Sequence, residues 1–235
     1  MLEKINSPKD LKGLSTGELI GLCKELREYI TECCAKNPGH LGASLGAVEL
    51  AVALHYVFDT PNDKIVWDVG HQAYAHKILT GRREEFKNNR TKNGPSGFPK
   101  MSESPYDAFG VGHASTSVSA ALGLATAARL KGEEIKIVAV LGDGAATGGL
   151  SFEGLNNAGV SKTDILVILN DNQIAIDKNV GAMHNYLVKI TTSPTYNRIK
   201  NKIWNKVGNG KFRAILQKFA MSTKIAVVKH GSVFE

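Results

Sequence analysis

The chain has 235 residues and a formal net charge of +7, with 43% apolar and 22% charged residues. This composition is typical of a globular protein and excludes a disordered or collagen-like chain. No apolar run reaches the ~18 residues of a membrane span, and the N-terminus lacks the apolar segment of a secretory signal. Cysteines at positions 23, 33 and 34 form neither a disulfide framework nor a metal-binding CxxC pair. We therefore expect a reducing, cytoplasmic location.

The positive charge lies towards the C-terminus. Residues 186–235 contain ten Lys and Arg but only one acid, Glu235. We expect residues 1–182 to form one α/β domain and residues 183–235 to form a basic, partly mobile connecting segment. A basic cluster can bind nucleic acid, but this one has neither a recognition motif nor an aromatic stacking platform. The sequence favours neither a nucleic acid nor a membrane as a partner.

Helical and strand patterns alternate along the first 170 residues. Ser15 or Thr16 is a suitable N-cap for the first amphipathic helix. Strands that alternate with helices predict an α/β fold, with a mainly parallel sheet and helices on both faces. A long Gly/Pro/Ser-rich connection over 88–112 is of the kind that is usually functional or mobile. The predicted helices span about 15–36, 45–58, 115–130 and 150–159, and the predicted strands span 64–69, 135–141 and 164–170.

Two predicted strands end in polar sequences that suit a metal-bound phosphate. One strand is followed by Gly142-Asp143-Gly144, and the next ends in Asn170-Asp171-Asn172. Because ligands gather beyond the carboxyl ends of parallel strands, Asp143 and Asn172 are expected to lie near one site. Their side-chain oxygens suit Mg²⁺, and the glycines let the backbone approach a diphosphate. Gly-Asp-Gly alone is more often a simple turn, but the matching polar end of the next strand favours a site.

Longer blocks of sequence carry a specific resemblance. The 27 residues between the GDG segment and Asn172 resemble the metal–diphosphate motif of thiamine-diphosphate enzymes. More closely, the chain resembles the 1-deoxy-D-xylulose-5-phosphate synthase family from about residue 14 onwards, most strongly over 39–182. This resemblance implies the thiamine-diphosphate-binding fold. The segments that carry it include GHLGASLGAVELAVALHYVFDTP, WDVGHQAYAHKILTGRR, SGFP, YDAFGVGHASTS, GDGAATGGLSFEGLNNAG and DILVILNDNQIAI.

The resemblance implies roles for individual residues. His40 and His71 take the catalytic roles, His40 near the substrates and His71 also beside the cofactor. The family usually has serine where Ala114 stands, so a hydroxyl contact is lost that the neighbouring Ser115 offers to replace. The implied Mg²⁺ ligands are Asp143, Asn172 and the backbone carbonyl of Ile174. The other implied cofactor-binding positions are Gly112, His113, Ala114, Gly144, Ala145 and Asn172.

The resemblance also implies a reaction. In this family, pyruvate condenses with D-glyceraldehyde 3-phosphate to give 1-deoxy-D-xylulose 5-phosphate and CO₂, with thiamine diphosphate and Mg²⁺ as cofactors. The product serves isoprene and thiamine biosynthesis. The resemblance covers roughly the first two-fifths of a family member. We therefore expect the chain to need C-terminal domains or a partner subunit, to be inactive alone, and to belong to a homodimer.

Two alternatives stay open at this point. The first is the N-terminal part of a transketolase, which shares the GDG motif and the first GH loop but resembles WDVGHQAYAHKILTGRR and SGFP much less. The second is a non-catalytic interaction module, which the absence of thiamine diphosphate binding would favour.

Overall fold

A parallel sheet forms the centre of the part of the chain that the computed structural model describes, residues 1–161 and 163–171. In this part, strands β1 (Lys64–Trp67), β2 (Ile137–Gly142) and β3 (Leu166–Asn170) pair in the order β1-β2-β3. All pairs are parallel, and the register places Gly142 opposite Asn170. The predicted parallel α/β fold is therefore confirmed here. The expected connecting segment over 183–235 lies outside the described residues.

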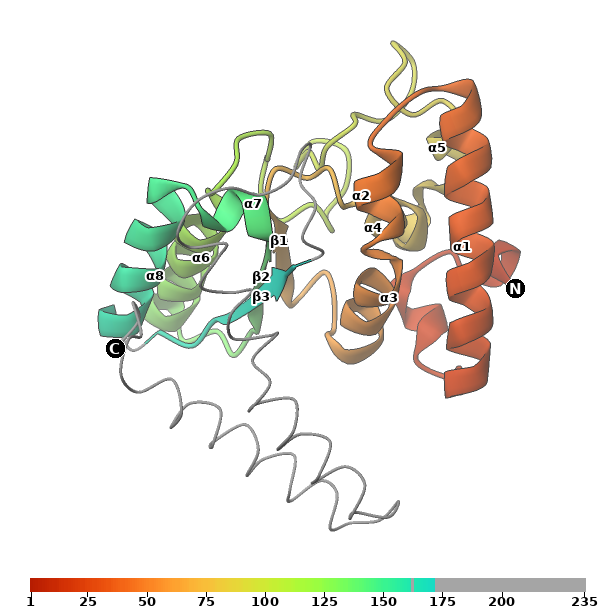
Figure 1. Ribbon diagram of the computed structural model, residues 1–235. Helices are drawn as coiled ribbons and strands as arrows, with labels where there is room; N and C mark the ends of the chain where they lie inside the picture. The colour runs from red at the N-terminus through yellow and green to blue at the C-terminus, as the bar shows by residue number, and fades with distance from the viewer. Residues whose placement is uncertain (162, 172–235) are drawn as a thin grey trace, which may run out of the picture. The chain divides into compact units, whose positions relative to one another are not determined.

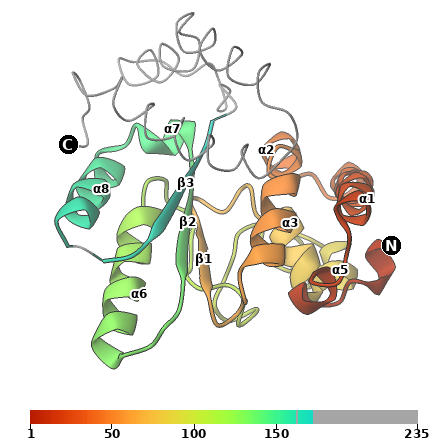
Figure 2. The same cartoon turned by 90° about the horizontal axis from the view of Figure 1, so that it is seen from below.

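Helices cover both faces of this sheet, as predicted. Figures 1 and 2 show α6 (Ser117–Lys131) and α8 (Gly149–Ser161) on one face, and α1 (Thr16–Lys36) and α3 (Val48–Val57) on the other. Every residue of β2 is buried, because its side chains pack alternately into the two layers. This burial explains the continuous apolar run in the sequence.

Helix α1 begins where the sequence predicts. Ser15 and Glu18 form a capping box: the Glu18 amide donates to the Ser15 hydroxyl, and the Ser15 amide donates to the Glu18 carboxylate at 2.8 Å. One face of the helix is buried in the core, and its buried residues are Leu22, Cys23, Leu26, Ile30, Cys33 and Cys34. All three cysteines are unbonded and buried.

The prediction of one helix over 45–58 is wrong in detail. Two helices occupy this region, α2 (Leu41–Leu45) and α3 (Val48–Val57). Ala47 between them has φ −111° and ψ 7°, which is not helical, and Gly46 is a poor helix former. The earlier start of α2 has a consequence for function, because His40 immediately precedes it as its N-cap residue.

A further helical stretch was not predicted from the sequence. It consists of α4 (Tyr74–Lys77), η3 (Ile78–Arg82) and α5 (Arg83–Phe86). Gly81, with φ +92°, interrupts the regular helix and so hides its periodicity in the sequence. The remaining short elements are η1 (Leu2–Lys4), η2 (Pro8–Leu11) and α7 (Asp143–Ala146). Within the described residues, none of the helices is long and apolar enough to cross a membrane.

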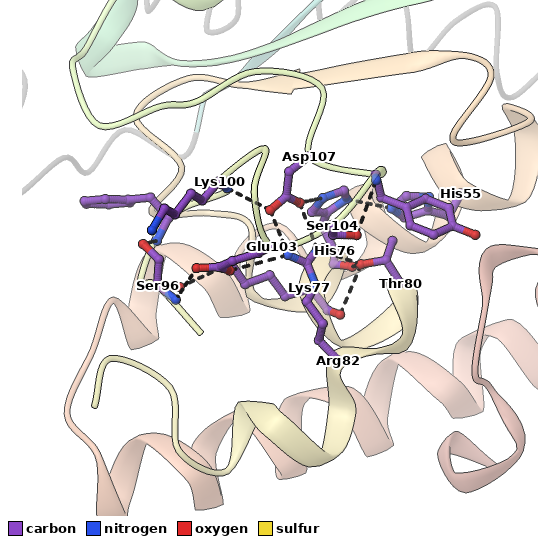
Figure 3. Close-up of polar contacts among 12 residues, drawn as sticks. His55, His76, Lys77, Thr80, Arg82, Ser96, Lys100, Glu103, Ser104 and Asp107 are labelled. Atoms are coloured by element: carbon purple, nitrogen blue, oxygen red, sulfur yellow. Dashed lines mark hydrogen bonds and ion pairs between the residues drawn. The ribbon is translucent and has the colours of Figure 1, made fainter. Parts of the chain in front are cut away.

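The Gly/Pro-rich connection over 88–112 is held by a buried polar network rather than by helices or strands (Figure 3). Asp107 accepts hydrogen bonds from His76 Nε2 at 2.9 Å and from both terminal nitrogens of Arg82 at 2.7 and 2.8 Å. The other nitrogen of His76 lies 2.9 Å from His55 Nε2, and His55 Nδ1 lies 2.9 Å from the Thr60 hydroxyl. These contacts join α3, α4 and the connection.

The network fixes the protonation of its two histidines. Burial lowers the pKa of His55 well below its usual value, and it also lowers the pKa of His76 against the opposing effect of Asp107. Both rings are therefore neutral near pH 7. With Asp107 as the acceptor at one end, His76 must donate from Nε2 and His55 must donate to His76 Nδ1.

We expect the stability of the protein to fall as the pH drops below about 6.5. Both histidines bind protons more readily when unfolded, so each can contribute about 1.4 kcal/mol per pH unit below that value, down to its folded pKa. Urea unfolding between pH 8 and pH 5 measures the slope. His55→Gln should reduce it, whereas His113→Gln, at an exposed position, should leave it unchanged. An undiminished slope in His55→Gln contradicts this assignment.

Candidate functional site

The loops that follow the three strands meet at the carboxyl end of the sheet. Gln72, in the loop after β1, accepts a hydrogen bond from Asn170 Nδ2 at the end of β3, at 2.7 Å. Its amide nitrogen lies 2.9 Å from the position that a Cβ on Gly142 would take, so a side chain there would displace it. Gln72 is buried. It thus bridges the ends of β1 and β3 across the glycine that ends β2.

A second set of contacts brings the start of α6 to the same edge. Asp68, directly after β1, accepts hydrogen bonds from the backbone amides of Ser115 at 2.7 Å and Ser117 at 2.9 Å. The N-cap residue of α6, Thr116, makes no capping bond of its own, so Asp68 caps this helix from 49 residues away. The Ser115 hydroxyl donates to the carbonyl of Ala145 at 2.7 Å. The segments around 112–117 and 143–146 are therefore tied together.

His40 and His71 lie beside each other in this region. Their ring centroids are 6.2 Å apart, in an edge-to-face arrangement. The backbone at each residue is anchored: the His40 amide donates to the Tyr74 hydroxyl at 3.0 Å, and the Ser44 hydroxyl donates to the His71 carbonyl at 2.8 Å. Sequence analysis placed both histidines in loops at element ends, and that placement is confirmed.

Both imidazoles are held in the neutral form. Burial lowers the pKa of His71, partly opposed by Asp68, and burial also lowers the pKa of His40, aided by Arg90 and His71. The Nδ1 atoms of both rings are buried and have no hydrogen-bond partner. Two neutral imidazoles with unused ring nitrogens can accept or pass protons to a bound molecule.

The expected metal ligands are only partly described. Asp143 is buried as the first residue of α7, and its Oδ1 accepts a hydrogen bond from the Gly144 amide at 3.0 Å. Asn172 and Ile174 lie outside the described residues. The residue pairing of Gly142 with Asn170 sets the segments beginning at Asp143 and Asp171 side by side. Among residues 1–161 and 163–171, no three His, Cys, Asp or Glu side chains gather as a metal site.

The remaining expected cofactor positions line open space. Gly112, His113 and Ala114 are exposed, and Gly144 and Ala145 are half-buried. A Cβ on Gly112 would meet no atom within 4 Å. The hydroxyl proton of Ser115, which was expected to replace a lost serine at position 114, is engaged by the Ala145 carbonyl. Its oxygen lone pairs are its remaining means of contacting a ligand.

Comparison with known proteins identifies the family. The model of the family described as 1-deoxy-D-xylulose-5-phosphate synthase matches residues 2–235. The chain belongs to this family. Its membership decides against the transketolase alternative.

Several curated 1-deoxy-D-xylulose-5-phosphate synthases are similar to most or all of the chain. The protein from Cytophaga hutchinsonii is 54% identical over 100% of this chain and 38% of its own length. That from Azobacteroides pseudotrichonymphae is 55% identical, with the same coverage of both chains. That from Carboxydothermus hydrogenoformans is 59% identical over 86% of this chain and 33% of its own length. The chain thus spans 38% of the length of the first two relatives.

Two residues that organise the site were missed from the sequence. Gln72 stands in the GHQAY segment beside His71, but nothing in the sequence pairs it with Asn170, 98 residues later. Asp68 was expected to lie buried behind the site, which is correct, but its capping of α6 was not foreseen. The available signal was the absence of an Asp, Asn or Glu at the start of that helix, which left the capping position without its usual charged partner.

Proposed function

We propose that the chain supplies the thiamine-diphosphate-binding part of an enzyme that condenses pyruvate with D-glyceraldehyde 3-phosphate. The products would be CO₂ and 1-deoxy-D-xylulose 5-phosphate, an isoprenoid precursor. The observation that carries the proposal is the meeting of three loops at the carboxyl end of the sheet, joined by Gln72, Asp68 and Ser115. Family membership supports the choice of reaction.

The residues present suit the cofactor. The carboxylate of Asp143, with Asn172 and the Ile174 carbonyl outside the described residues, would hold Mg²⁺, which prefers oxygen ligands. Backbone at Gly144 and Ala145 would contact the diphosphate. When bound, thiamine diphosphate supplies the carbon nucleophile and electron sink that a decarboxylating condensation needs.

Further contacts would come from the histidines and from the loop before α6. His71, with the exposed segment Gly112-His113-Ala114, would line the cofactor. The unpartnered, buried Nδ1 atoms of His40 and His71 are suited to receiving hydrogen bonds from bound molecules. We assign His40 to the substrates, where a neutral imidazole can accept a proton as charge develops. A cytoplasmic homodimer is part of the same proposal.

Calorimetric titration with thiamine diphosphate tests the proposal. We expect Mg²⁺-dependent binding, and we expect Asp143→Ala to weaken it at least ~100-fold, because the remaining ligands leave the metal charge poorly matched. Asp164→Ala is the matched control: this carboxylate is 91% exposed on the opposite end of β3. Equal affinity of the Asp143→Ala variant and the parent contradicts the metal assignment.

The reaction itself is tested by adding pyruvate and D-glyceraldehyde 3-phosphate. We expect turnover once the chain is supplied with the regions that its relatives have beyond the matched part. No cofactor binding and no turnover in that assembled protein would leave the non-catalytic interaction module as the better interpretation.

A further inference from the structure

Two carboxylates organise the segment between residues 96 and 107. Glu103 Oε1 accepts a hydrogen bond from the backbone amide of Ser96, and Asp107 Oδ2 accepts one from the backbone amide of Lys100, both at 2.7 Å. Each acid thus closes a loop onto the amide seven residues before it. The two closures bracket Gly97, Phe98 and Pro99 between them.

Both carboxylates are also fastened to buried cations on the helical stretch after β1. Lys77 Nζ donates to Glu103 Oε2 and to the Ser96 carbonyl, both at 2.7 Å, and Arg82 pairs with Asp107 (Figure 3). The Lys77 and Asp107 side chains are 0% exposed. Charges buried this deeply keep their geometry, because separating a pair leaves each partner unsolvated. Both ends of the bracketed segment are therefore anchored to a rigid helix.

The bracketed segment lies against both site histidines. The Phe98 ring stacks on the His40 ring, with centroids 5.2 Å apart and an interplanar angle of 23°. Pro99 Cδ lies 2.6 Å from the place that a Cβ on Gly70 would take, immediately before His71. Gly70 has φ +95°, so this close approach uses both the missing side chain and the left-handed backbone.

We propose that Phe98 is a positioning residue for His40, and that Glu103 and Asp107 act through it by anchoring its segment. The proposal rests on the proposed function only in assigning His40 to the reaction. The stacked ring covers one face of the imidazole, restricts its rotation and keeps water from it. The depressed pKa of His40 is consistent with such a dry contact. No polar group is needed for this role, so an aromatic ring at position 98 is the requirement.

The test is an NMR titration of the His40 ring in the cofactor-free chain, with its signal assigned by His40→Gln. Phe98→Leu removes the ring but keeps an apolar side chain. We expect it to shift the His40 ring signal and to raise the pKa of His40 by about half a unit or more towards its ordinary value. Phe98→Tyr retains the ring and should restore the parent signal and pKa. Phe109→Leu, which removes an exposed aromatic ring of the same connection, should change neither.

The anchoring carboxylates are tested in the same spectra. Glu103→Gln should move the His40 signal in the direction that Phe98→Leu does, since it weakens one anchor. Glu49→Gln, which alters a surface ion pair with Arg27 on α1, should not. A His40 signal and pKa that are the same in Phe98→Leu and the parent overturn the proposal. This outcome is separate from that of the proposed function, because the titration uses no cofactor and no substrate.

Discussion

Replacing Asp107 by alanine is expected to lower the free energy of unfolding by about 3–5 kcal/mol, the range found when one partner of a buried ion pair is removed. The carboxylate accepts four hydrogen bonds, from His76, twice from Arg82 and from the Lys100 amide. Burial alone would raise the pKa of Asp107, but the bonds from His76 and Arg82 hold it below its usual range. Alanine leaves the guanidinium in a dry site without its main counter-charge.

Urea unfolding at pH 7 measures the loss, with Glu49→Ala as the matched control. Glu49 also pairs with an arginine, Arg27, but on the surface, where such pairs contribute about 0–1 kcal/mol. The double variant Arg82→Met with Asp107→Leu removes both charges and should recover a large part of the stability, because the uncompensated charge is gone. A loss in Asp107→Ala no larger than that of the control contradicts the interpretation.

The second large effect is expected for Asp68→Ala. Its carboxylate is the acceptor for two buried amides, those of Ser115 and Ser117, and each unpaired buried donor costs about 1–3 kcal/mol. Ser115 also has φ +72°, which a residue with a side chain adopts only when its surroundings enforce it. Without Asp68, both the start of α6 and the segment over 112–115 should loosen.

Hydrogen exchange at the two serine amides measures the local loss, and urea unfolding measures the global one. Asp68→Asn keeps one acceptor oxygen and should lose about half as much stability as alanine. Asp63→Ala is a matched control, since that carboxylate also accepts two backbone amides, from Asp59 and Lys136, but does so at the surface. Water can replace it there. Equal losses in Asp68→Ala and Asp63→Ala would count against a special role for the buried cap.

Local chemistry made part of the fold predictable. The Ser15–Glu18 capping box, the alanine-rich pattern of α6 and the apolar run of β2 each act over a few residues, so their signals lie together in the sequence. The GDG segment was expected to follow a strand because a buried strand pattern ends there, and the structure confirms this position.

The rest of the site depends on contacts between distant residues. His76 and Asp107 are 31 residues apart, and the acid stands in a Gly/Pro-rich connection whose pattern predicts no element at all. The helical stretch beside it was missed because the left-handed Gly81 interrupts its period. The stacking of Phe98 on His40 follows only once these anchors exist. No pattern within a short window contains that information.

The Gln72–Asn170 bridge has a consequence for the order in which the molecule can assemble. A polypeptide is made from its N-terminus, so the core of α1 and α3 can pack before β3 has been synthesised. The loops of the site, in contrast, join residues 47, 30 and 98 positions apart. Closing such long segments costs entropy before any contact forms. A molecule that binds across all three loops therefore stabilises only chains that have completed this last step, and so acts as a check on finished folding.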